Sequence, residues 1–194
     1  MGPTDFTEPP FSIKHFGKKA TMKASELQQH SLADERQTDR WGRALALALP
    51  EQSLIKQAFV ITLQGDLGAG KTTLARSILQ GLGVTGRIKS PTYPLVEFYN
   101  LPNYPAYHFD LYRFSSPDQW FDAGFDDIFA SPGLMLVEWP DKAAGAMPAA
   151  DLDIQLQLAD IDDTRQLLVT AHSAPAQQCL TTLATLLAKD ADGS

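Results

Sequence analysis

The feature that most constrains this chain is a glycine-rich segment, Gly65-Asp66-Leu67-Gly68-Ala69-Gly70-Lys71-Thr72. It meets the pattern G-x-x-x-x-G-K-[ST], in which Gly65, Gly70, Lys71 and Thr72 occupy the specified positions. Glycines permit positive φ angles and let backbone N–H groups point inward. Together with the N-terminus of a following helix, such N–H groups form a concave anion site. The segment therefore predicts a loop that binds the phosphates of a nucleotide.

The last two side chains of this loop have chemical roles in that prediction. The Lys71 ammonium group supplies a compact positive charge for the β- and γ-phosphates and is a candidate catalytic group. The Thr72 hydroxyl is placed to ligate Mg²⁺, which takes a few protein oxygens beside phosphates and waters. We also expect nucleotide contacts from the remaining loop residues and the residue after them: Asp66, Leu67, Gly68, Ala69 and Thr73. The guanine-reading motif N-K-x-D is absent, and the expected cofactors are ATP or ADP with Mg²⁺.

The surrounding segments favour a functional loop over an accidental glycine-rich turn. A β-rich run at 58–63 precedes it and a helix-forming run at 73–82 follows, which is the context that the motif requires. Further strands are expected at 95–99, 106–109, 134–137, 152–158 and 166–170, helices at 32–49 and 176–189, and helical or mixed structure at 118–129. This order predicts a three-layer α/β fold of the P-loop NTPase type. Its central sheet would be mostly parallel, with an antiparallel hairpin, turning at 160–163, at one edge.

Length and composition predict the domain organisation and the cellular setting. The chain has 194 residues, of which 44% are hydrophobic and 20% charged, values typical of one globular domain. We predict a flexible N-terminal extension over residues 1–30, where periodicity is weak, and a single ATPase domain over 31–190. The single cysteine, Cys179, is expected to pack in a helix and indicates a reducing compartment, the cytoplasm. No apolar stretch reaches the ~20 residues that span a bilayer, so no membrane association is expected.

Two acidic residues end predicted strands and are candidates for the metal site. Glu138 follows the apolar run 134–137, and Asp110 follows Tyr107-His108-Phe109. A phosphate loop needs an acid at the end of a neighbouring strand to hold the metal ion and its waters. Ligands of open α/β sheets bind at this edge, which favours both acids over the alternative of solvated carboxylates. Glu138 is the stronger candidate, because its strand is continuously apolar.

Three neighbouring side chains each have two interpretations. His108 alternates with Asp110 and can face the same side, or it can pack as a strand histidine. Arg113 can reach a phosphate or pair with an acid of the segment 118–127. Trp139 can stack near the nucleotide or fill the core.

With these residues in place, the chain resembles the TsaE (YjeE) family of small bacterial ATPases, which act in making threonylcarbamoyladenosine on tRNA. Four segments carry the resemblance: G-D-L-G-A-G-K-T-T at 65–73, S-P-T-Y at 90–93, Y-H-F-D-L-Y-R at 107–113 and L-V-E-W at 136–139. Their order and spacing also match, over roughly 35–170. The phosphate loop alone is generic, whereas the other three segments together are specific.

The resemblance implies roles for several of these residues. Thr72 and Glu138 would hold Mg²⁺, and Asp110 would lie near the γ-phosphate and be needed for hydrolysis. Ser90 and Thr92 would belong to a switch-like loop that senses the nucleotide.

The family pattern also implies nucleotide contacts outside these motifs. Trp139 would lie close to the site, and Arg165 matches a late arginine that the family uses at the nucleotide. Glu35 and Thr38 fall where the N-terminal segment of the family approaches the adenine side. Pro94 is a departure, since threonine is common there; it restricts the preceding residue to extended geometry and would stiffen the switch-like loop.

The resemblance implies a protein partner, the TsaB–TsaD assembly that transfers the threonylcarbamoyl group. ATP turnover would reset that assembly between rounds, and tRNA would be involved only indirectly. The net charge of −7 argues against a broad nucleic-acid surface, which needs clustered Lys and Arg. It fits a protein that docks on another protein.

Two other function classes remain as alternatives. A small-molecule or nucleoside kinase would need an acceptor pocket and usually an arginine-bearing lid, but residues 115–130 are acidic and contain no arginine. A non-catalytic nucleotide sensor would keep Lys71 and Thr72 but could dispense with a water-orienting acid. The presence of both Asp110 and Glu138 favours an enzyme.

Overall fold

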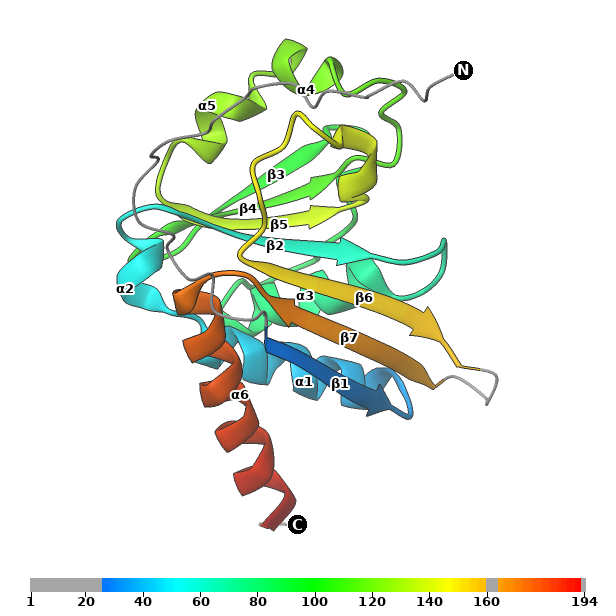
Figure 1. Ribbon diagram of the computed structural model, residues 1–194, viewed down its shortest axis with the longest axis vertical. Helices are drawn as coiled ribbons and strands as arrows, with labels where there is room; N and C mark the ends of the chain where they lie inside the picture. The colour runs from blue at the N-terminus through cyan, green and yellow to red at the C-terminus, as the bar shows by residue number, and fades with distance from the viewer. Residues whose placement is uncertain (1–25, 160–163, 193–194) are drawn as a thin grey trace, which may run out of the picture.

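The computed structural model describes residues 26–159 and 164–192 (Figure 1). Within these residues one sheet contains seven strands, in the spatial order β1 (Glu26–Leu32), β7 (Arg165–Ala171), β6 (Leu152–Leu158), β2 (Ala58–Gln64), β5 (Gly133–Glu138), β4 (Pro105–Asp110) and β3 (Val96–Asn100). The four central strands, β6, β2, β5 and β4, are parallel to one another. β7 is antiparallel to β6. The predicted parallel sheet with an antiparallel edge hairpin is therefore confirmed, and the turn predicted at 160–163 lies outside the described residues.

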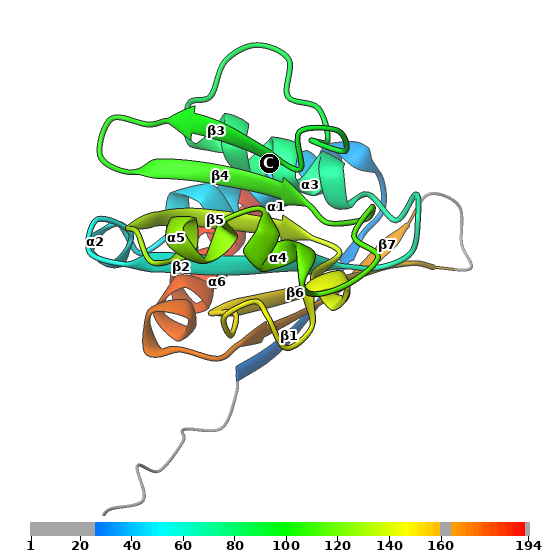
Figure 2. The ribbon, with the colours of Figure 1, turned by 90° about the horizontal axis from the view of Figure 1, so that it is seen from above.

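Helices lie on both faces of the sheet, which makes the fold the predicted three-layer type (Figures 1 and 2). α1 (Glu35–Ala48), α3 (Lys71–Gly81) and α6 (Ala174–Asp192) pack on one face. α4 (Gln119–Asp122), α5 (Phe125–Phe129) and the 3₁₀ helix η1 (Pro140–Ala143) pack on the other. A short helix, α2 (Glu51–Leu54), leads from α1 into β2.

The two faces have different cores because side chains alternate along each strand. Phe59, Ile61 and Leu63 of β2 join the aliphatic core beneath α1, α3 and α6. Val60 of the same strand joins a second, aromatic core that includes Phe109. Cys179 of α6 is buried in the first core, as predicted, and burial raises the pKa of its thiol to about 12.

The helix α1 follows from its sequence pattern. Asp34 caps its N-terminus by accepting a hydrogen bond from the backbone N–H of Gln37 at 2.8 Å. Trp41 and Leu45 face the core, as their four-residue spacing predicts. Pro50 follows the last turn, which ends the helix where the sequence indicated.

One predicted boundary is wrong. Residues 26–30, which we assigned to a flexible extension, form most of β1 and pair with β7 from Glu26 opposite Ala171 onward. This edge strand contains two leucines among polar residues, and backbone hydrogen bonds to β7 hold it, so its apolar periodicity is too weak to indicate a strand. Residues 1–25 lie outside the described part of the chain. The opposite edge strand, β3, is antiparallel to β4, an orientation that the sequence analysis did not specify.

Candidate active site

The phosphate loop connects β2 to α3 at the carboxyl edge of the parallel strands, as predicted. Gly65 has a φ of 139°, and a β-carbon there would lie 2.2 Å from the carbonyl oxygen of Leu156 on the neighbouring β6. Gly70, which precedes the first turn of α3, has a φ of 104°. Only glycine accepts both positions without strain, so the fold requires the glycines that the motif specifies.

The side chain of Lys71 lies across this loop. Its Nζ donates hydrogen bonds to the carbonyl oxygens of Gly65 at 2.6 Å and Asp66 at 2.8 Å. It also lies 3.7 Å from the centroid of the Trp139 ring, a cation–π contact. Burial lowers the pKa of Lys71, and the negative charges of Glu138 and Asp110 oppose that shift. Hydrogen bonds, a cation–π contact and attraction to the two acids therefore hold the ammonium group at the loop.

Trp139 owes its place to an unusual backbone conformation. Its φ of 60° lies in the left-handed region, which costs energy for a bulky residue. Its backbone N–H donates to the Leu63 carbonyl at 3.3 Å, which ties the end of β5 to β2. The indole ring consequently covers Lys71, and it also packs on the Tyr112 ring with the centroids 5.1 Å apart.

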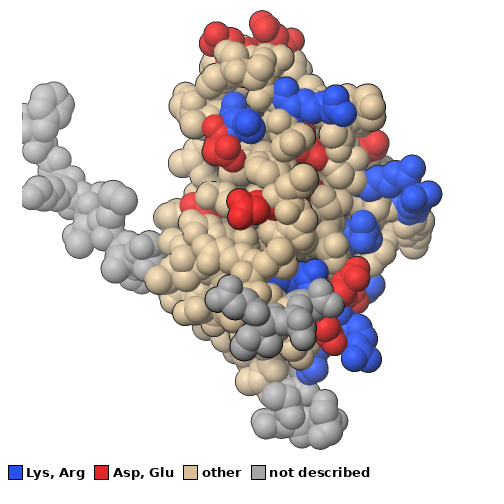
Figure 3. Space-filling model, turned by 90° about the vertical axis from the view of Figure 1, so that its right-hand side faces the viewer, with Lys and Arg blue, Asp and Glu red and all other residues tan. Residues whose placement is uncertain are grey.

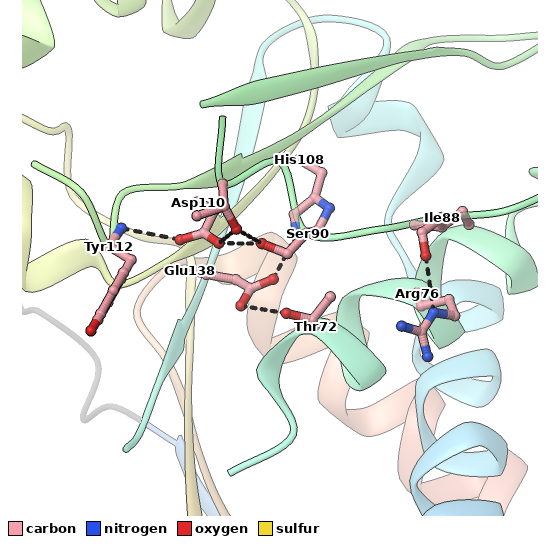
Figure 4. A network of polar contacts seen from close by, with 9 residues as sticks. Thr72, Arg76, Ile88, Ser90, His108, Asp110, Tyr112 and Glu138 are labelled. Atoms are coloured by element: carbon pink, nitrogen blue, oxygen red, sulfur yellow. Dashed lines mark hydrogen bonds and ion pairs between the residues drawn. The ribbon is translucent and has the colours of Figure 1, made fainter. Parts of the chain in front are cut away.

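Glu138, at the end of β5, connects the phosphate loop to β4 (Figure 4). Its Oε2 accepts a hydrogen bond from the Thr72 hydroxyl at 2.9 Å. Its Oε1 lies 2.8 Å from Nε2 of His108. Both Glu138 and His108 are buried. The two residues predicted to hold a metal ion, Thr72 and Glu138, are thus in direct contact.

Asp110 pairs with Glu138 in the register of β4 and β5, so both acids end adjacent strands. Its Oδ2 accepts hydrogen bonds from the hydroxyl groups of Ser90 and, at 3.2 Å, of Thr92. Its Oδ1 accepts one from the backbone N–H of Tyr112 at 3.0 Å. The carboxylate is therefore fixed at both oxygens, and the predicted switch-like loop is attached to it (Figure 4).

Backbone hydrogen bonds close the switch-like loop, residues 90–95, and connect it to β4. The residue after Pro94, Leu95, has a φ of 66°, and its backbone N–H donates to the Pro91 carbonyl at 2.8 Å. The Leu95 carbonyl in turn accepts from the N–H of Asp110 at 3.1 Å. Tyr93 of this loop is 85% exposed. The Arg113 guanidinium lies over its ring, 4.6 Å from the ring centroid. Arg113 thus contacts an aromatic ring of this loop rather than an acid of the segment 118–127.

These groups surround one pocket of about 430 Å³. It is lined by most of the residues predicted to contact a nucleotide or metal, with Ser90 and Tyr112 in addition: Leu67, Gly68, Gly70, Lys71, Thr72, Thr73, Ser90, Thr92, Asp110, Tyr112, Glu138 and Trp139. The sequence analysis missed Tyr112, which acts through its backbone N–H, a group that no side-chain pattern reveals.

Three predicted residues from outside the phosphate loop lie apart from this pocket, and Gly65, Asp66 and Ala69 of the loop itself do not line it either. Nε of Arg165 is 3.5 Å from where a β-carbon on Gly70 would lie, so this side chain rests against the phosphate loop. Glu35 lines an adjacent pocket of about 390 Å³, which shares Thr73 with the first. Thr38 is buried and its hydroxyl donates to the Asp34 carbonyl at 3.2 Å, so it lines neither pocket.

The donor set fits a nucleotide with a divalent ion. The loop between β2 and α3 offers backbone N–H groups and one ammonium group, which suit phosphate oxygens. Thr72 and Glu138 offer a hydroxyl and a carboxylate oxygen, the oxygen ligands that Mg²⁺ prefers. Basic and acidic side chains both occur on the described part of the face in Figure 3, with several of the basic ones along its right-hand side.

Comparison with known proteins identifies the family. A family model described as "Threonylcarbamoyl adenosine biosynthesis protein TsaE" matches residues 32–167, which include the phosphate loop and both acids. The chain belongs to the TsaE family. Membership confirms the resemblance inferred from the four sequence segments.

Individual TsaE proteins match over most of their length. The Haemophilus influenzae tRNA threonylcarbamoyladenosine biosynthesis protein TsaE is 41% identical over 142 residues, which cover 73% of this chain and 88% of that protein. The Bacillus subtilis protein of the same name is 39% identical over 126 residues, 65% and 78% of the two chains. The crystal structure of Bacillus subtilis YdiB aligns with a TM-score of 0.68 at 28% identity, covering 84% of this chain and 97% of that one. In the part of the chain that the structure describes, every helix is too short or too polar to cross a membrane.

Proposed function

We propose that this protein binds and hydrolyses ATP with Mg²⁺ in the biosynthesis of threonylcarbamoyladenosine on tRNA. The family membership supports the pathway. The observation that supports the chemistry is the pair of acids Asp110 and Glu138, which end adjacent parallel strands and line the same pocket as the phosphate loop. A nucleotide hydrolase needs both a cradle for phosphates and acids at this edge.

The phosphate loop would supply the binding contacts. Its backbone N–H groups and the N-terminus of α3 would bind the phosphate oxygens. Lys71 would exchange its hydrogen bonds to the Gly65 and Asp66 carbonyls for bonds to phosphate oxygens. Trp139, which covers the ammonium group, would keep water away from that contact.

Thr72 and Glu138 would hold the metal ion through one hydroxyl and one carboxylate oxygen. When bound, Mg²⁺ would neutralise negative charge on the phosphate oxygens. Thr72 is in the first turn of α3, so its hydroxyl is fixed relative to the loop, and Glu138 is fixed by the end of β5. Both ligands are therefore oriented before a nucleotide arrives.

Asp110 would orient the attacking water or a water bound to the metal ion. Phosphoryl transfer is catalysed mainly by positioning and charge stabilisation, with little covalent chemistry for the protein to perform. The hydroxyl groups of Ser90 and Thr92 and the Tyr112 N–H hold the carboxylate in one orientation. Because Ser90 and Thr92 belong to the switch-like loop, a shift of Asp110 on hydrolysis would move that loop as well.

The partner in this proposal is the TsaB–TsaD assembly, with tRNA involved only indirectly. ATP turnover would reset that assembly between rounds of threonylcarbamoyl transfer. The exposed Tyr93 gives the switch-like loop a side chain with which to report the nucleotide state to a partner. A role in tRNA modification agrees with the cytoplasmic location expected from the sequence.

The test is release of inorganic phosphate from ATP, measured without any added phosphate acceptor. We expect Mg²⁺-dependent release that is slow for the protein alone and faster when purified TsaB and TsaD are present. Release only after a small-molecule acceptor is added would indicate a kinase instead. Nucleotide binding without release under any of these conditions would indicate a sensor and would overturn the proposed ATPase activity.

A further inference from the structure

The strand β4 carries a histidine at a position where its neighbours are apolar. His108 faces α3, on the same side of the sheet as Ala106 of β4 and Leu136 of β5, both part of the aliphatic core. Its side chain is completely buried. A leucine or phenylalanine would fill such a position without burying a polar group. A buried imidazole costs free energy unless it makes a hydrogen bond, so we expect it to make one.

That contact is with Glu138, whose two carboxylate oxygens have different partners. His108 pairs with Leu136 in the strand register, so its ring reaches diagonally to Glu138, where Nε2 lies 2.8 Å from Oε1. The Thr72 hydroxyl donates to the other oxygen, Oε2. Figure 4 shows Glu138 held between these two side chains.

The protonation of the ring follows from its partners. Nδ1 of His108 is buried and has no hydrogen-bond partner among the described residues. An ionised carboxylate only accepts hydrogen bonds, so Nε2 carries the ring hydrogen and donates a hydrogen bond to Oε1. Oε1 of Glu138 is therefore occupied by a hydrogen bond from a buried side chain.

We propose that His108 is a positioning residue for Mg²⁺: it holds Oε1 of Glu138 so that Oε2 alone is turned toward Thr72 and the metal ion. This inference rests on the proposed function. Without the Nε2 donor, the carboxylate could rotate about its terminal bond or bind the ion through both oxygens, and its geometry toward Thr72 would be lost. Hydrogen-bond partners of metal ligands typically contribute 10- to 100-fold to metal affinity.

The first measurement is the Mg²⁺ concentration that gives half-maximal tight binding of a non-hydrolysable ATP analogue. We expect His108→Leu to raise this concentration by about 10-fold or more, while affinity for the analogue without Mg²⁺ stays unchanged. His108→Gln, which retains a donor nitrogen at a similar distance from Cα, should restore a value close to wild type. Met135→Leu is the matched control, because it changes a buried side chain of β5 on the opposite face with little change in volume.

The second measurement needs no nucleotide. A ¹⁵N spectrum of the four histidines of the wild-type protein should contain one ring with a protonated Nε2 that is protected from exchange. That signal should disappear in His108→Gln.

Each result separates this inference from the proposed function. Overlapping Mg²⁺ titrations for wild type and His108→Leu would overturn the positioning role and leave the ATPase proposal standing. An equal loss of affinity for the analogue with and without Mg²⁺ would have the same meaning. An unprotonated Nε2 on His108 would also overturn it. If binding of the analogue to the wild-type protein does not depend on Mg²⁺ at all, the metal site itself is wrong and both proposals fail.

Discussion

Asp110 illustrates, at the scale of one residue, how neighbouring groups prepare a carboxylate for a reaction. It is 5% exposed, and its two oxygens accept hydrogen bonds from Ser90, Thr92 and the Tyr112 backbone. These hydrogen bonds restrict the rotation of the carboxylate. A charged group that is already oriented loses little entropy when it acts on a water molecule.

The variant Asp110→Asn tests whether this charge serves catalysis. The amide keeps the size and one acceptor oxygen, so we expect ATP affinity to be unchanged and phosphate release to fall by about 10²-fold or more. The matched control is Asp141→Asn, which removes a nearby carboxylate that acts on Lys71 but does not line the pocket. Near-normal turnover together with a lowered melting temperature would mean that Asp110 has only a structural role.

At the scale of elements, the sequence predicted those segments whose burial leaves a periodic pattern. β5 is buried at every position and reads as a continuous apolar run, and α1 shows four-residue spacing. β1 was missed because a polar edge strand depends on backbone pairing with β7. In the site, the motif predicted Thr72 as a metal ligand, and the end of an apolar strand predicted Glu138. The diagonal contact of His108 with Glu138 depends on strand register, which one sequence does not reveal.

The assignment of β1 makes a prediction about truncation. A protein that lacks residues 1–30 should have a lower melting temperature than one that lacks only residues 1–25, because the shorter chain loses most of β1 and exposes the edge of β7. In a domain of this size each kcal/mol lost lowers the melting temperature by about 2–4 °C. Equal melting temperatures for the two proteins would show that β1 contributes no stability.

The same strand should respond to acid through His30. Its ring packs edge-on against Trp41, with centroids 5.5 Å apart, and Nε2 is buried without a hydrogen-bond partner among the described residues. Burial lowers the pKa of His30 in the folded state below its ordinary value of 6.5. As the pH drops below 6.5, the unfolded chain therefore takes up the proton before the folded chain does, and the free energy of unfolding falls. Above pH 6.5 His30 is neutral in both states and does not change the stability.

Urea unfolding at pH 7 and pH 5 measures this effect. His30→Phe keeps an aromatic ring on Trp41 and cannot be protonated, so the loss of stability between the two pH values should be smaller than in wild type. Gln29→Phe, on the exposed face of β1, should retain the wild-type pH dependence. An unchanged pH dependence in His30→Phe would exclude His30 as the acid-sensitive group.

At the scale of the whole molecule, the pocket draws its groups from segments far apart in the chain. The phosphate loop, the switch-like loop, β4 and β5 each contribute, and Arg165 of β7 rests against the loop from the other half of the sheet. A ligand that bridges these segments binds only the folded protein. It should stabilise the whole fold by about 2.7 kcal/mol when its concentration is 100 times its Kd.

Calorimetric titration of a non-hydrolysable ATP analogue with Mg²⁺ tests the central claim most directly. The account predicts that the wild-type protein binds one analogue per chain and that Lys71→Ala, which removes the ammonium group of the phosphate loop, loses most of this affinity. Lys56→Ala, at an exposed position between α2 and β2, should bind as wild type does. Equal binding by Lys71→Ala and wild type, with both proteins folded, would contradict the assignment of this loop as the nucleotide site.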